Sequence, residues 1–160
     1  MLEVGKNTYV TVEEATEYIQ ENYSPKNILR AHWDVCPDTY KEQYLRKSMI
    51  EIEALPFVGR KTIWSGPLQF PRTLMNAPLY VMRNPIYLMY NANAYEVPLQ
   101  VKAAEIENAL GIIKKEYRPT SKAVVLAALG LVSSVTDGAG RLSSERAEEL
   151  LKPFLGTIKA

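Results

Sequence analysis

The chain has 160 residues, of which 47% are hydrophobic and 23% charged, and this predicts one ordinary globular domain spanning residues 1–160. Its 19 basic and 18 acidic residues give a net charge of +1, which argues against a DNA binder that relies on a large basic excess. One cysteine excludes an internal disulfide and a cysteine-cluster metal site. The sequence has no apolar run long enough to span a bilayer and no basic-then-apolar leader, so we expect no membrane partner and no secretion.

A first helix is predicted directly after a short N-terminal extended segment. Thr11 and Glu14 have the spacing of a capping box, in which each side chain satisfies a backbone N–H of the other residue. The helix is expected to run to about Tyr23. Residues 25–38 remain open between a short helical turn and an irregular stretch.

A second helix is expected to run from a cap at Asp38 or Thr39 to about Leu55. Its apolar side chains recur at the spacing of one helical face. The buried stripe is predicted to hold Leu45, Ser48, Met49, Ile52 and Leu55.

The middle of the chain changes in texture. Residues 56–72 are rich in proline and glycine and predict a turn-rich connection. A long irregular loop is predicted at about residues 73–96, with 79–82 and 86–90 as possible arms of a hairpin. The loop either folds over its own core or contacts another chain. The side chains proposed for a partner or subunit interface are Tyr80, Met82, Tyr87, Met89, Tyr90 and Tyr95.

The strongest helix signal covers Val97 to Tyr117. Its main apolar stripe is predicted to hold Leu99, Ala103, Ile106, Leu110, Ile113 and Tyr117. The opposite face is mixed, with Val101 and Ile112 among polar residues such as Glu105 and Asn108. Two apolar strips are compatible with two alternatives. The helix is either buried in the core of one domain, or it packs on its own core with one side and on a neighbouring subunit with the other. Gly111 is expected to weaken the helix by about 1 kcal/mol relative to alanine.

The C-terminal third predicts one ambiguous segment and one helix. Residues 123–136 are either a buried helix or two short strands that bend near Gly130. Ser143 or Ser144 is expected to cap a final helix. Its apolar side is predicted to hold Ala147, Leu150, Leu151 and Phe154. The predicted fold class is mainly α: a small bundle of about four helices with a short β-hairpin and the long irregular loop.

Residue types that carry chemistry are sparse. His32, Asp34 and Cys36 form the only cluster of metal-ligand types, and they lack a fourth ligand at a standard spacing. The sequence contains no nucleotide-binding glycine loop. We therefore expect no enzyme activity, no cofactor and no metal. Two groups of basic residues could contact phosphate or the DNA inside a channel, although such groups more often form a solvated surface. These are Arg60, Lys61 and Arg72, and Lys114, Lys115, Arg118 and Lys122.

Several pieces together resemble a phage family, the head–tail connector adaptors that are often labelled DnaT-like. In chain order the pieces are residues 7–15, Trp33, 52–61, 68–72, 97–105 and 150–156. No single piece is specific. As a set, the Leu-Gln-Phe-Pro-Arg element, the Val-Pro helix start and the Leu-Lys-Pro-Phe-Leu ending are moderately specific.

The resemblance implies a structural virion protein at the neck between head and tail, made in the host cytoplasm. Members assemble as homo-oligomeric rings of about twelve copies. The ring binds the portal protein on one side and a stopper or tail completion protein on the other, and DNA passes through its channel. The family also implies a short β segment near Leu129 and Gly130.

A second hypothesis belongs to a different functional class. In this alternative the protein is a single-stranded-DNA-binding accessory protein, as the DnaT-like label suggests. Tyrosine and tryptophan side chains would stack on bases beside Arg60, Lys61 and Arg72. Such binding should weaken steeply as the salt concentration rises.

Overall fold

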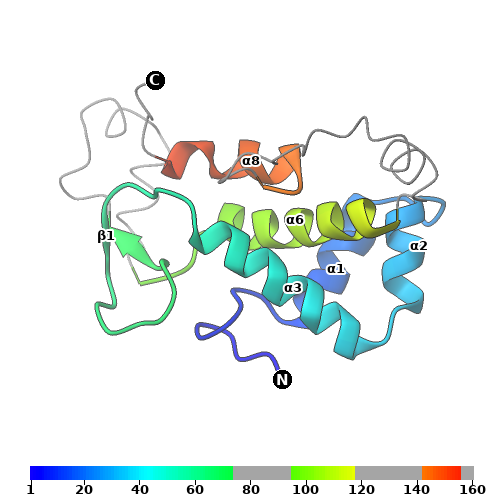
Figure 1. Cartoon of the computed structure of the whole chain (residues 1–160), viewed down its shortest axis with the longest axis horizontal. Helices are drawn as coiled ribbons and strands as arrows, with labels where there is room; N and C mark the ends of the chain where they lie inside the picture. The colour runs from blue at the N-terminus through cyan, green and yellow to red at the C-terminus, as the bar shows by residue number, and fades with distance from the viewer. Residues whose placement is uncertain (74–94, 118–141, 156–160) are drawn as a thin grey trace, which may run out of the picture.

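The computed structural model describes residues 1–73, 95–117 and 142–155, and these residues form a mainly helical domain (Figure 1). The elements are α1 (Val12–Asn22), α2 (Ile28–Val35), α3 (Asp38–Glu53), β1 (Arg60–Lys61), β2 (Arg72–Thr73), α6 (Leu99–Tyr117), α8 (Glu145–Leu151) and the 3₁₀ helix η1 (Lys152–Phe154). The predicted mainly α fold with a short β-hairpin is confirmed. The described hairpin is β1–β2, inside the stretch predicted to be a turn-rich connection. The hairpin arms predicted at 79–82 and 86–90, and the segment 123–136, lie outside the described residues.

The starts of α1 and α2 follow local capping chemistry. At α1, Thr11 and Glu14 form the predicted capping box. The ambiguous stretch before α3 contains α2, because the Asn27 side chain accepts the N–H groups of Leu29 and Arg30 and starts a helix there. The cap predicted at Asp38 or Thr39 is wrong. The N-cap residue of α3 is Pro37, and no side-chain hydrogen bond caps this helix.

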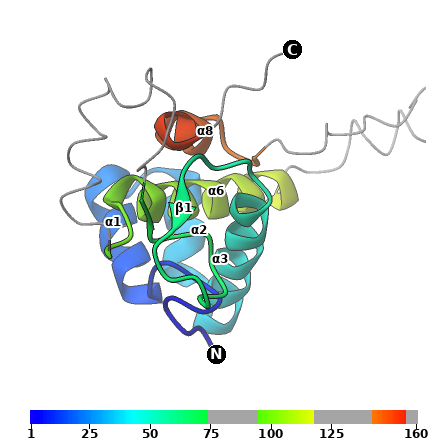
Figure 2. The same ribbon diagram turned by 90° about the vertical axis from the view of Figure 1, so that its left-hand side faces the viewer.

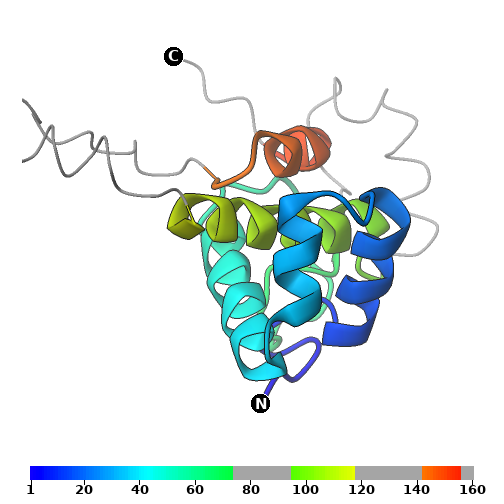
Figure 3. The same cartoon turned by 90° about the vertical axis from the view of Figure 1, so that its right-hand side faces the viewer.

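Helix α6 lies at the centre of the domain and contacts α1, α2, α3 and α8 (Figures 1 and 2). Val101 and Ala104 face a core cluster that also holds residues of α3 and α8, whereas Leu110 and Ile113 face a second cluster with α1 and α2. Figure 3 shows α1 and α2 side by side against this second face. Both apolar strips of α6 are therefore covered largely within one domain. Leu99 is the exception, because its side chain is 78% exposed.

Gly111 has a packing role that the sequence did not predict. A Cβ atom at this position would lie 2.5 Å from the Ser143 carbonyl oxygen, so only glycine lets the segment before α8 approach α6. Beside this contact, the Asn108 side-chain oxygen accepts the N–H groups of Ser143 at 2.7 Å and Ser144 at 3.2 Å. Ser144 then caps α8 as predicted, with its hydroxyl accepting the N–H of Ala147. Among the helices of the described part of the chain, none is long and apolar enough to cross a membrane.

Candidate nucleic-acid interface

The β1–β2 hairpin projects from one end of the helical bundle (Figure 1). Its antiparallel register pairs Arg60 with Thr73 and Lys61 with Arg72. The side chain of Trp64, in the connecting loop, is 91% exposed, and that of Ile63 beside it is 47% exposed. An indole ring in water next to basic strand residues is a combination typical of surfaces that bind unstacked nucleotides.

Three aromatic rings hold the base of the hairpin on the bundle. The Phe70 ring packs edge-on against Phe57 and Phe154, with ring centroids 4.8 and 5.9 Å apart. The backbone N–H of Val58 donates to the carbonyl of Phe154 at 2.9 Å, and Phe57 forms an isolated antiparallel bridge with Leu155. The segment that enters strand β1 and the residue Phe70 before strand β2 are therefore fixed to the C-terminal 3₁₀ turn.

Arg72 stabilises the hairpin from inside. Its side chain is 7% exposed. The guanidinium donates to the carbonyls of Phe57, Val58 and Gly59 at 3.1, 3.0 and 2.7 Å, and also to the side-chain oxygen of Gln69. The sequence placed Arg72 among phosphate contacts, but its donors are turned toward backbone carbonyls. We therefore leave Arg72 out of the candidate interface, which keeps Arg60 and Lys61.

The two remaining basic residues, Arg60 and Lys61, differ in their surroundings. The Arg60 side chain is exposed. The Lys61 ammonium donates to the Gly66 carbonyl at 2.8 Å and so ties strand β1 to the middle of the loop. Trp64, which lies between these two points, was not singled out in the sequence. No short-range pattern in the sequence indicates that Trp64 reaches the surface.

A buried polar network lies beneath the hairpin. The Tyr9 hydroxyl donates to the Glu53 carboxylate and accepts the N–H of Phe70 at 3.3 Å. Glu53 also accepts the N–H of Gln69 at 2.8 Å. Burial raises the pKa of Tyr9, and the carboxylate of Glu53 raises it further. The network thus links the N-terminal segment, α3 and the irregular segment that leads into β2.

Glu105 anchors the same N-terminal segment from α6 and is fully buried. One carboxyl oxygen accepts the N–H of Tyr9 at 2.8 Å. The other lies 2.7 Å from the Thr8 hydroxyl, which also lies 2.8 Å from the carbonyl of Val10. Since a hydroxyl has one proton, both contacts are satisfied when Thr8 donates to Val10 and a protonated Glu105 donates to Thr8.

The electrostatics agree with a neutral Glu105 side chain. Burial raises its pKa to about 8, although the hydrogen bonds with the Thr8 hydroxyl and the N–H of Tyr9 oppose the shift. Nearby Glu53 and Glu14 add to the increase. The sequence placed Glu105 and Asn108 on a mixed outer face of the helix, whereas both side chains are completely buried. Their partners lie far away in the chain, so helical periodicity could not reveal them.

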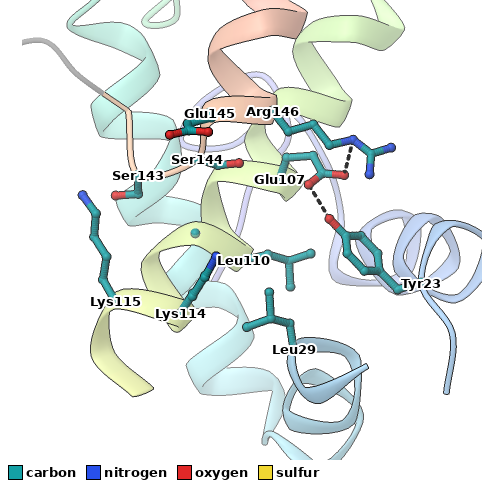
Figure 4. Close-up of a pocket in the computed structure, with 11 residues that line it drawn as sticks. Tyr23, Leu29, Glu107, Leu110, Lys114, Lys115, Ser143, Ser144, Glu145 and Arg146 are labelled. Atoms are coloured by element: carbon teal, nitrogen blue, oxygen red, sulfur yellow. Dashed lines mark hydrogen bonds and ion pairs between the residues drawn. The ribbon is translucent and has the colours of Figure 1, made fainter. Parts of the chain in front are cut away.

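A cavity of about 470 Å³ lies between α6, α8 and α2, and its α6 wall includes Lys114 and Lys115 (Figure 4). Glu107 is 2% exposed at this cavity. Its carboxylate accepts the Tyr23 hydroxyl at 2.5 Å and lies 3.2 Å from the Arg146 guanidinium. The carboxylate therefore docks α8 through Arg146, and the cavity wall carries both signs of charge.

The other predicted residues are placed as follows. Lys114 and Lys115 are exposed on α6, well separated in sequence from the hairpin, and Tyr95 is 79% exposed. The remaining interface and basic residues lie outside the described residues; they are Tyr80, Met82, Tyr87, Met89, Tyr90, Arg118 and Lys122. Trp33 is buried, with its indole N–H donating to Thr16 at 3.0 Å. Residues 1–73, 95–117 and 142–155 contain no group of three or more side chains suited to hold a metal ion.

Comparison with known proteins identifies one family. Its model, described as "putative DnaT-like ssDNA binding protein", matches residues 2–159. Searches of curated proteins and of solved structures gave no match. The match covers nearly the whole chain and agrees with the DnaT-like label of the resemblance, while it carries no evidence for a head–tail connector. The chain therefore belongs to this DnaT-like family.

Proposed function

We propose that the protein binds single-stranded DNA through the β1–β2 hairpin. Trp64 stacks on a base, and Arg60 and Lys61 contact the flanking phosphates. The observation that carries the proposal is the 91% exposure of Trp64, in the loop that directly follows the basic strand residues Arg60 and Lys61. The family description supports the same ligand.

The contrast between the two tryptophans strengthens this argument. Trp33 is fully buried and hydrogen-bonded, as a core tryptophan should be. Trp64 leaves nearly all its apolar surface in water, which is unfavourable unless a ligand covers it. Stacking of a base on an aromatic ring contributes about 1–3 kcal/mol and tolerates any base. The ligand expected here is therefore a single strand of little sequence preference.

The near-neutral net charge sets the expected strength of the electrostatic contribution. Only a few phosphates can be neutralised by Arg60 and Lys61, so the logarithm of affinity should fall with the logarithm of salt with a slope of about −1 to −2. This expectation is shallower than for a protein with a long basic groove. Binding should depend on stacking as much as on charge.

The test is fluorescence anisotropy with a labelled oligothymidine, compared for the wild type and Trp64→Ala. We expect the variant to bind about tenfold to a hundredfold more weakly, because one stacking contact is lost. Tyr40→Ala is the matched control, since Tyr40 is 54% exposed on α3 and is not part of the hairpin. Equal affinity of Trp64→Ala and the wild type would rule out the hairpin as the binding surface.

A second candidate is the head–tail connector subunit suggested by the resemblance. The supporting observation is that three of the resembling pieces pack into one unit through Phe57, Phe70 and Phe154. A rigid unit of this kind would suit a subunit that repeats around a ring. Native mass measured by light scattering, alone and with a portal protein, tests this candidate: ring assembly on the portal supports it, and a monomer that ignores the portal contradicts it.

A further inference from the structure

A second surface of the molecule is chemically opposite to the hairpin. A groove of about 420 Å³ lies between α1 and α6. Its floor is apolar, with Val10 and Ile106 almost completely buried below it. Its α1 side is acidic. The carboxylates on that side are those of Glu14, Glu17 and Glu21.

The apolar floor continues to an uncovered side chain. Leu99 and Ala103 stand at the start of the α6 stripe, about two turns and one turn of the helix before Ile106. Ile106, Leu110 and Ile113 are buried in a cluster with residues of α1 and α2, but Leu99, which also lines the groove, remains 78% exposed. An apolar stripe that runs out of its own core into an open groove is typical of a surface that another segment covers.

The charges around the groove determine which kind of segment can bind there. Among the groove residues, Lys102 is the one cation, and its ammonium lies 2.8 Å from the Glu14 carboxylate. Glu17 and Glu21 are exposed along the same face of α1, one helical turn apart. A phosphate backbone would be repelled here, whereas lysine or arginine side chains would be attracted.

We infer that the α1–α6 groove docks a basic amphipathic segment of a protein partner. An apolar side chain of that segment covers Leu99 and Ala103, and its basic side chains face Glu17 and Glu21. This inference goes beyond DNA binding and does not depend on it, because no residue of the hairpin lines the groove.

The experiment uses two synthetic probes with the full-length protein. One is a short amphipathic helical peptide of leucine and lysine, and the other is the same peptide with every lysine replaced by glutamate. Isothermal titration should show binding of the lysine peptide alone. The double variant Glu17→Lys/Glu21→Lys should weaken that binding at least about tenfold, because two attractive contacts become repulsive.

The control is Glu13→Lys/Glu149→Lys, which changes the net charge equally at exposed positions outside the groove. It should bind the lysine peptide about as tightly as the wild type. Leu99→Ser should weaken binding severalfold by removing the apolar contact, and circular dichroism confirms that each variant is folded.

Three results would overturn the inference. One is absence of binding by the lysine peptide, and another is equal loss of binding in the control variant. The third is self-association of the wild type that Glu17→Lys/Glu21→Lys abolishes, because the groove would then be occupied by a second copy of this chain.

Discussion

The hairpin and the α1–α6 groove differ in charge, in shape and in the elements that form them. The hairpin presents an exposed indole beside basic strand residues, on a segment that aromatic packing holds in place. The groove presents an apolar floor beside exposed carboxylates on a regular helix. A chain with a net charge of +1 thus separates its charges into local surfaces of opposite sign. The overall charge balance therefore says little about which ligands the molecule attracts.

The comparison also shows how differently the two surfaces are supported. The groove is built from neighbouring helices, whereas the hairpin depends on Arg72 and on a polar network through Tyr9 and Glu53. Disturbing that support should affect the hairpin and leave the groove unchanged.

Arg72→Ala should have the largest effect. It leaves the carbonyls of Phe57, Val58 and Gly59 without their charged donor, and we expect unfolding to become easier by about 3 kcal/mol. Urea denaturation measures this loss. Arg72→Met is the control that keeps the length of the side chain, and it should be nearly as destabilising. If Arg72→Met were as stable as the wild type, packing of the stem rather than hydrogen bonding would hold the hairpin.

Glu105 should make stability depend on pH. Its pKa is about 8 in the folded protein against 4.5 for the ordinary group, so the folded state binds more protons between these values. The contribution of this group to stability is fully present below about pH 4.5 and is lost as the pH rises toward 8.

Glu105→Gln tests the origin of that pH dependence. The amide can donate to Thr8 and accept the Tyr9 N–H, so the contacts survive without a titrating group. We expect the stability of this variant to change less between pH 5 and about 8 than that of the wild type, as measured by urea denaturation at several pH values. An identical pH profile in both proteins would show that Glu105 is not the titrating group.

Arg60→Gln should have the smallest effect, and it concerns DNA alone. Removing one phosphate contact should lower single-strand affinity severalfold and reduce the salt slope by about 1. Titrations of a labelled oligonucleotide at several salt concentrations measure both quantities. Lys114→Gln is the control from outside the hairpin, and an equal change there would point to a diffuse basic surface instead.

Local sequence rules predicted much of the fold. The capping box at Thr11, the cap at Ser144 and the buried stripe of α3 depend on residues a few positions apart, and all are confirmed. The role of Gly111 depends on Ser143, 32 positions away, and therefore could not be read from helix propensity.

The candidate site was predicted only in part. Arg60 and Lys61 were expected as phosphate contacts and lie on strand β1. Arg72 was grouped with them because all three are basic, yet the cluster of carbonyls around it forms only when the hairpin closes. The exposure of Trp64 likewise depends on the loop projecting from the bundle, which no short-range pattern in the sequence specifies.

If a DNA base covers Trp64 in the complex, tryptophan fluorescence should detect it directly. Trp33 is fully buried, so quenching on addition of oligothymidine should come from Trp64. We expect saturable quenching of tryptophan fluorescence in the wild type and none in Trp64→Phe, with an affinity for DNA that falls as salt is added. Saturable DNA binding measured by anisotropy with no change in Trp64 fluorescence would contradict the account, and so would the absence of any binding at low salt.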